Sequence, residues 1–361
     1  MMMSEKAKQH VESCRFCWMC HHICPIGNAT GHERSTPRAR ALGISLVNRG
    51  AIELEEIMDN IYECAGCGAC VHDCTTGWDP VMFTKEVRLQ AALDGKLPAY
   101  INEMVDNCLE SGNAYGKTAL CETLAAAIAA HAEKTDTLFF LGQDTRAMAC
   151  KQGYKAIQVL EKAGVRFTAL ASEPASGAQL DFLIGAAEET KEQMLAAAAV
   201  MNGYKTVVFY DPQDAKTVKQ TYGAYGIELT CKAVTYTAFL AELVKSGALK
   251  GEKKGKTVVV QDPFQLARDL EETEEVRAVV SAFAELHEMH LNRGETVWAG
   301  NILMAQYIPE VMKLVAERRI FNAKSLGEKT IVTCSVSEYV SLKNAENSEI
   351  EILSLEDLIL D

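Results

Sequence analysis

Two stretches of the sequence, CRFCWMCHHICP at residues 14–25 and CAGCGACVHDC at residues 64–74, repeat one spacing of cysteines. Each run reads C-x2-C-x2-C-x3-C, and a proline follows the first run. This spacing is typical of [4Fe–4S] ligation, in which three thiolates on one tight loop bind three irons and the fourth iron needs a ligand from elsewhere. The two runs hold eight of the chain's 13 cysteines and predict an iron–sulfur module with two clusters near its start.

The fourth cysteine of each run indicates how the two predicted clusters share their ligands. In proteins with two such clusters, the last cysteine of one run binds the cluster of the other run. This exchange would hold the clusters side by side, near enough for electron tunnelling. Gly66 and Gly68 fit this interpretation, because the backbone must wrap closely around the cluster. The predicted ligand sets are Cys14, Cys17, Cys20 and Cys74 for the first cluster, and Cys64, Cys67, Cys70 and Cys24 for the second.

Other uses of these cysteines are weaker interpretations. Paired C-x2-C knuckles could bind two structural zinc ions, and cysteines can also form disulfides in an oxidising compartment. Residues 25–63 between the runs read as helices rather than hairpins, which favours a helical two-cluster module over a compact β-rich ferredoxin. Outside the runs, Cys108 and Cys121 are expected to be small core residues.

Composition bounds the remaining possibilities. The chain has 361 residues, 48% of them hydrophobic and 24% charged, as in ordinary globular proteins of two or three domains. Its net charge of −13 makes it a poor binder of nucleic acid. The first residues, MMMSEKAKQH, lack the apolar segment of a secretory signal, and no apolar run approaches the length of about 20 residues that spans a bilayer. We therefore expect a cytoplasmic protein without a transmembrane segment.

The pattern of predicted secondary structure changes along the chain, from helices alone to alternating strands and helices. In the front part, Pro37 and Pro80 follow helix-capping residues, and Gly50 and Gly95 are placed to end the two helices. Later, short apolar strands alternate with helical stretches, which indicates an α/β arrangement. The predicted strands are Thr137–Leu141, Val165–Leu170, Thr206–Tyr210, Thr257–Gln261, Lys329–Thr333 and Ile350–Leu355.

The α/β part looks duplicated. GYKTVV at residues 203–208 matches GEKTIV at residues 327–332, and each follows a predicted long helix. The polar stretch KGEKKGK at residues 250–256 reads as a linker between the two copies. The predicted fold class is α+β and multidomain. Its parts are a helical ferredoxin-like module over residues 1–115 and two tandem α/β domains over residues 135–249 and 257–361.

The cysteine runs, STPR at residues 35–38, GNAYG at residues 112–116, Asp262-Pro263 and Pro309 together resemble a known family. Its members are the iron–sulfur subunits of anaerobic glycerol-3-phosphate dehydrogenase, glycolate oxidase and lactate-utilisation systems, and the D-type subunits of heterodisulfide reductase. They join a helical two-cluster module to two tandem cysteine-rich "CCG" domains. The resemblance covers nearly the whole chain.

The α/β part departs from this family because every CCG-type cysteine is replaced. Cys334 falls one place before an expected ligand. Iron–sulfur sites need soft thiolates, so the resemblance implies that the scaffold is kept and the cluster of the CCG domains is lost. The aligned positions are Gln143, Ala175-Ser176-Gly177 and Asp211-Pro212-Gln213-Asp214 in the first half, and Phe264, Trp298-Ala299-Gly300 and Ser335-Val336-Ser337-Glu338 in the second.

The resemblance implies an electron-transfer subunit of an oxidoreductase complex. Its partner would be a flavoprotein, either an FAD-dependent dehydrogenase or an electron-transferring flavoprotein, and the chain could dock at the membrane periphery. No nucleophile elbow or dinucleotide fingerprint is present, which favours a carrier over a self-sufficient enzyme. Two alternatives remain: a docking protein with mainly structural clusters, or a protein that binds a flavin or a substrate in the altered CCG site. Arg15, Arg34, Arg38 and Arg40 could offset the charge of a cluster or face an acidic partner, but we expect them to lie on a solvated helix face.

Overall fold

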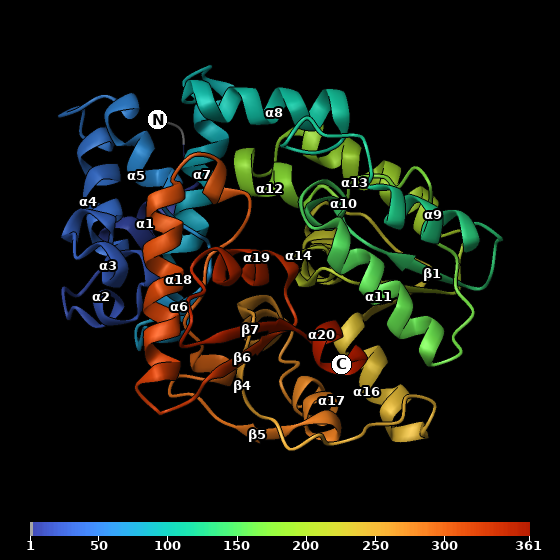
Figure 1. The fold of residues 1–361 in the computed structure, drawn as a ribbon. Helices are drawn as coiled ribbons and strands as arrows, with labels where there is room; N and C mark the ends of the chain where they lie inside the picture. Colours follow the sequence, from blue (N-terminus) through green and yellow to red (C-terminus); the bar gives the residue numbers. More distant parts are fainter. Residues whose placement is uncertain (1–2) are drawn as a thin grey trace.

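The helices of the N-terminal part begin and end at the residues that the sequence marks. The computed structural model describes residues 3–361. Pro37 is the first residue of α4, and Asp79 caps α7 by accepting a hydrogen bond from the Met82 amide at 2.9 Å. These helices, drawn in blue to teal, form one side of the molecule (Figure 1). They are α1 (Glu5–Glu12), α2 (Met19–Ile23), α3 (Pro25–Thr30), α4 (Pro37–Asn48), α5 (Met58–Tyr62), α6 (Ala69–His72), α7 (Pro80–Leu93) and α8 (Ala99–Ser111).

The first α/β half contains a three-stranded parallel sheet in the order β1-β2-β3. Its strands are short and buried toward their carboxyl ends, as expected for strands covered by helices on both faces. Its elements are α9 (Glu122–Ala130), β1 (Thr137–Phe140), α10 (Gln143–Met148), α11 (Cys150–Lys162), α12 (Ala178–Ile184), α13 (Glu188–Met201), β2 (Thr206–Phe209), α14 (Pro212–Lys216), α15 (Tyr222–Ala224), β3 (Lys232–Thr235) and α16 (Tyr236–Ser246).

The second half contains a four-stranded parallel sheet in the order β5-β4-β6-β7. A π-helical turn at Gln265–Asp269 precedes its first long helix, and a similar turn at Thr217–Thr221 lies in the first half. Its regular elements are β4 (Thr257–Gln261), α17 (Glu274–Phe283), β5 (Glu285–His287), α18 (Pro309–Lys324), β6 (Thr330–Thr333), α19 (Val336–Asn344), β7 (Glu351–Ser354) and α20 (Leu355–Leu360).

The two sheets repeat one pattern. β2 lies between β1 and β3, and β6 lies between β4 and β7, so the two matching sequence segments occupy equivalent central strands. The α+β fold class is therefore confirmed, and the order of strands supports the duplication. The domain boundaries at residues 115, 135, 249 and 257 remain predictions.

Two strands escape the sequence-based prediction, and one predicted strand is nearly absent. β3 and β5 lie at sheet edges, and Thr235 is the one buried residue that the structure describes in the two strands, so they lack a clear apolar pattern. The predicted strand Val165–Leu170 makes only one isolated bridge, between Thr168 and Leu138 of β1. It sits beside β1 as β5 sits beside β4, so it is the weakened counterpart of an edge strand.

The helical module packs against both halves. Leu180 and Leu183 of α12, and Leu303 of the second half, belong to the same apolar cluster as the N-terminal helices. The Tyr62 hydroxyl donates to the Leu183 carbonyl at 2.6 Å, and the Tyr307 hydroxyl donates to the Tyr62 carbonyl at 2.9 Å. These contacts hold the segment before the second cysteine run against the α/β body.

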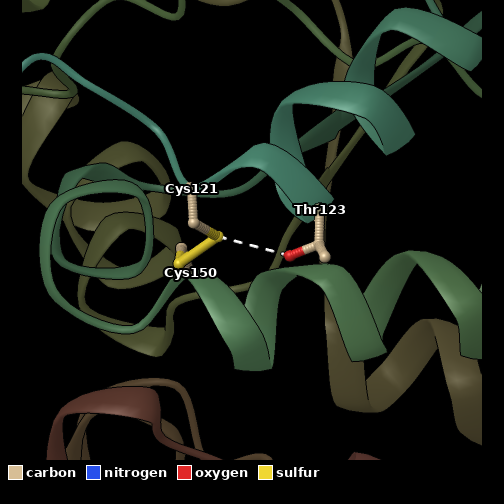
Figure 2. Close-up of a disulfide and its surroundings, with 3 residues drawn as sticks. All are labelled: Cys121, Thr123 and Cys150. Carbon is tan, nitrogen blue, oxygen red and sulfur yellow. Dashed lines mark hydrogen bonds between the residues drawn. A yellow bond between two sulfur atoms is a disulfide. The ribbon is translucent and has the colours of Figure 1, made fainter.

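A disulfide joins Cys121, just before α9, to Cys150 at the start of α11 (Figure 2). The Cys121 sulfur also lies 3.5 Å from the Thr123 hydroxyl. The expectation of an unpaired core residue is confirmed for Cys108, which is buried, and is wrong for Cys121. Its partner lies 29 residues away, a separation that the spacing of the cysteines alone does not reveal. Across residues 3–361, no helix combines the length and apolarity needed to cross a membrane.

Candidate iron–sulfur site and the adjoining cavity

The first predicted ligand set lines one small cavity at the surface. Cys14, Cys17 and Cys20 come from the first run, and Cys74 comes from the end of the second run. Cys17 is exposed and the other three are partly exposed. The structure therefore brings together the four cysteines that the exchange of last ligands predicts, at a place open to solvent.

The second predicted ligand set lines a separate cavity. Cys64, Cys67 and Cys70 of the second run meet Cys24 of the first run there, and all four are buried. The short helix α3 begins directly after Cys24, and the Cys24 sulfur accepts a hydrogen bond from the Gly27 amide at 3.5 Å. Each cavity thus has four thiol donors, the number that a [4Fe–4S] cluster requires, and the donor set suits iron.

The two loops share one backbone conformation. Gly66 and Gly68 have positive φ values of 64° and 71°, as the expected close wrapping requires. At the equivalent places of the first run, Phe16 and Trp18 adopt φ values of 56° and 68°. In both loops the first cysteine sulfur accepts an amide hydrogen bond at 3.4 Å, from Phe16 to Cys14 and from Gly66 to Cys64. A left-handed conformation is unfavourable for bulky residues. Phe16 and Trp18 therefore adopt it because the loop requires it, against their own conformational preference.

The buried thiols are poorly suited to carry charge by themselves. Burial raises the pKa of Cys67 to about 11, and burial together with the neighbouring thiols raises the pKa of Cys70 well above its usual value. Burial also raises the pKa of Cys24, although the charge of nearby Arg40 opposes the shift. A metal must therefore displace protons from these thiols when it binds, as at other thiolate sites.

Arginines surround the second loop. Arg40 is buried and donates to the Ser35 carbonyl at 2.8 Å and to the Asn60 carbonyl at 3.0 Å. Arg88 donates to the Cys64 carbonyl at 2.7 Å, and Arg268 of the second α/β half donates to the Cys67 carbonyl at 2.9 Å. Arg88 and Arg268 thus hold the loop, Arg40 lines the same cavity, and the charge of these arginines can offset that of bound thiolates.

The expectation of a solvated arginine face is wrong for Arg40 and incomplete for Arg38. Arg40 belongs to the interior, since its guanidinium is placed between the thiols and two carbonyls. Arg38 stacks over the Trp18 ring at 3.7 Å from its centroid, beside the first cavity. Their positions in α4, two residues apart, do not reveal that each of them serves a different cysteine loop.

The positions that replace the family's CCG cysteines meet in a third cavity, between the two α/β halves. Gln143, Ser176 and Asp214 line it from the first half, and Trp298 and Glu338 line it from the second. Ala65, next to Cys64, reaches the same cavity, so it adjoins the second cysteine loop. Cys334 is packed in the core instead.

This cavity is small and acidic. Its volume is about 50 Å³, whereas pockets for drug-sized ligands measure about 300–1,000 Å³, so a flavin does not fit. Burial and the neighbouring Asp144 raise the pKa of Asp211 to about 7, and burial raises the pKa of Glu338 to about 8. Burial and Asp211 also raise the pKa of Asp214 well above its usual value. Within residues 3–361, the lining of this cavity thus offers carboxyl and amide groups and no thiol.

Comparison with known proteins agrees with this geometry. Residues 10–78, which contain both cysteine runs, match the family described as "4Fe-4S dicluster domain". The fold and the site thus define an iron–sulfur protein, whose residues 10–78 are similar to [4Fe–4S] dicluster domains.

More specific similarity extends over nearly the whole chain. The chain is 25% identical over 353 residues to the D-type subunit of the dihydromethanophenazine:CoB--CoM heterodisulfide reductase of Methanosarcina mazei, covering 90% of this chain and 86% of that protein. The same protein of Methanosarcina acetivorans is 24% identical over 390 residues, covering 97% and 92%. The resemblance to iron–sulfur subunits of the heterodisulfide reductase D type is thereby confirmed. A solved structure of a hypothetical protein from Helicobacter pylori matches with a TM-score of 0.49 and 11% identity, over 99% of this chain and 72% of that chain.

Proposed function

We propose that this chain relays single electrons between a flavoprotein and a downstream acceptor through two [4Fe–4S] clusters. Cys14, Cys17, Cys20 and Cys74 would hold one cluster, and Cys64, Cys67, Cys70 and Cys24 would hold the other. Each cluster, when bound, supplies a centre that accepts and releases one electron. The observation that carries the proposal is the grouping of the eight cysteines into two cavities, each with one ligand from the other run.

The two cavities differ in burial, so one end of the proposed relay lies at the surface and the other lies in the interior. The first cysteine set reaches the surface at Cys17, whereas the second is buried, and its Cys24 and Cys67 belong to an apolar cluster that includes residues of the second α/β half. A cluster near the surface can exchange electrons with a docked protein, and a buried cluster is shielded from solvent, which changes its potential. Electrons would therefore pass between a partner at the Cys17 end and the interior beside the altered CCG site.

The surface around Cys17 suits a protein partner. Phe16, Trp18 and Met19 are exposed by 65%, 46% and 50% of their surfaces. Exposed aromatic residues and methionine are enriched at interfaces between proteins. A flavoprotein that docks here would bring its flavin toward the more exposed cluster, and two clusters in series would take its two electrons one at a time.

The proposal is tested by chemical analysis and redox titration of protein purified without oxygen. We expect about eight irons and eight acid-labile sulfides per chain, and reduction should give an EPR spectrum of two interacting spins. Both clusters should cycle reversibly at potentials that a flavin can meet. Clusters that are present but do not cycle would instead support a structural role, and a chain without iron would refute the proposal.

A further inference from the structure

The cavity between the α/β halves is rich in hydrogen-bond acceptors. Within the described part of the chain, its lining includes four carboxylate side chains and no lysine, arginine or histidine. Asp144 already accepts hydrogen bonds from the Tyr115 hydroxyl and the Gln179 amide, each at 2.7 Å, and from the Ser337 hydroxyl at 3.1 Å. The lining carboxylates are Asp144, Asp211, Asp214 and Glu338.

Two buried side chains of the lining each hold an oxygen that lacks a donor among the described residues. Glu338 is 1% exposed, and its Oε1 accepts a long hydrogen bond of 3.4 Å from the Ala299 amide. Gln265 is 8% exposed, and its Nε2 donates to Gln213 at 3.0 Å. Across residues 3–361, Glu338 Oε2 and Gln265 Oε1 find no hydrogen-bond donor. A buried acceptor without a donor is unfavourable, so both atoms favour a ligand that carries N–H or O–H groups.

The lining also contains aromatic side chains. Phe182, Phe264 and Trp298 also line the cavity. Aromatic faces attract cations, and rings next to carboxylates are a known way to recognise ammonium groups that carry carbon substituents. The volume of about 50 Å³ favours a ligand of only a few heavy atoms, because pockets for drug-sized ligands measure about 300–1,000 Å³.

We infer that this cavity binds a small organic ammonium ion. Its N–H groups would donate to Glu338 and Gln265, and its carbon atoms would pack against the aromatic side chains. Burial raises the pKa values of Asp211 and Glu338, and a cation bound beside these groups would lower their pKa values and compensate the carboxylates that form when the protons leave. The inference does not depend on the proposed electron transfer.

Calorimetric titration of the anaerobically purified full chain with methylammonium and dimethylammonium chloride tests the inference, with sodium chloride as the ionic-strength control. We expect saturable binding of at least one of these ions at one site per chain. Glu338→Gln and Gln265→Met should each weaken this binding at least about tenfold, because each removes one unpaired acceptor while keeping the approximate shape. Glu317→Gln, at an exposed carboxylate on α18, should bind as the wild type does.

Circular dichroism and iron content establish that each variant is folded. The inference is overturned if folded wild-type protein shows no saturable binding of either ion up to about 10 mM. A specific site should bind even a ligand of this small size below that concentration. It is also overturned if both substitutions at the unpaired acceptors bind like the wild type. Tighter binding of Mg²⁺ would overturn it in favour of a metal site, and equal binding of neutral acetamide would overturn it in favour of a site for uncharged donors.

Discussion

Cys24→Ser is expected to remove the buried cluster and leave the more exposed one, although Cys24 belongs to the first cysteine run. The reason is that the Cys24 sulfur lies with Cys64, Cys67 and Cys70, not with the other cysteines of its own run. Cys74→Ser should likewise remove the exposed cluster while the second run stays intact. Each variant should retain about four irons per chain, which iron analysis and EPR of the reduced protein would measure.

Two further variants serve as matched references. Whether or not the two runs exchange their last cysteines, Cys67 binds the buried cluster and Cys17 binds the exposed cluster. Cys67→Ser and Cys17→Ser therefore each remove a ligand whose cluster is the same in either arrangement. Exchange of the last ligands predicts that the EPR spectrum of Cys24→Ser matches that of Cys67→Ser, and that Cys74→Ser matches Cys17→Ser. The opposite pairing would mean that each run holds its own cluster, and the assignment of ligands would then be wrong.

The cysteine runs could be recognised from the sequence because their chemistry is local. Three ligands within seven residues must share one loop, so the spacing alone indicates the type of cluster. The same is true of the helix starts at Pro37 and Pro80, since proline at the first position and, in α7, the Asp79 cap act within one turn. The left-handed backbone at Phe16 and Trp18 could have been inferred only from the equivalent glycines of the second run, because the residue types themselves argue against it.

Features that depend on distant parts of the chain were harder to predict. Arg40 reads as a surface residue because arginine is seldom buried, and only the folded chain shows the carbonyls and thiols that surround it. The resemblance to CCG domains identified positions far apart in the sequence that line one cavity. It could not indicate that Gln265 and Glu338 leave acceptors unpaired there, because hydrogen-bond partners follow from side-chain geometry.

The second half of the α/β body depends on a buried ion pair that the sequence does not reveal. Asp262 follows β4 and is 2% exposed, and Arg277 of α17 donates to both of its carboxylate oxygens, at 2.8 and 2.9 Å. The Arg293 amide also donates to Asp262, at 2.8 Å, and Arg277 reaches Glu288 as well. The pair thus joins the end of the central strand β4 to a helix and to the loop after β5.

Arg277→Met is therefore expected to destabilise the protein by about 3–5 kcal/mol, because Asp262 would remain buried without its cation. Urea unfolding followed by far-UV circular dichroism under anaerobic conditions would show this as a lower midpoint. Arg277→Met combined with Asp262→Asn should recover part of the loss, since the buried charge is then gone as well. Lys245→Met, which breaks the exposed pair with Glu242 on α16, should change stability by less than about 1 kcal/mol. Equal effects of Arg277→Met and Lys245→Met would show that the buried pair does not hold the strand, the helix and the loop together.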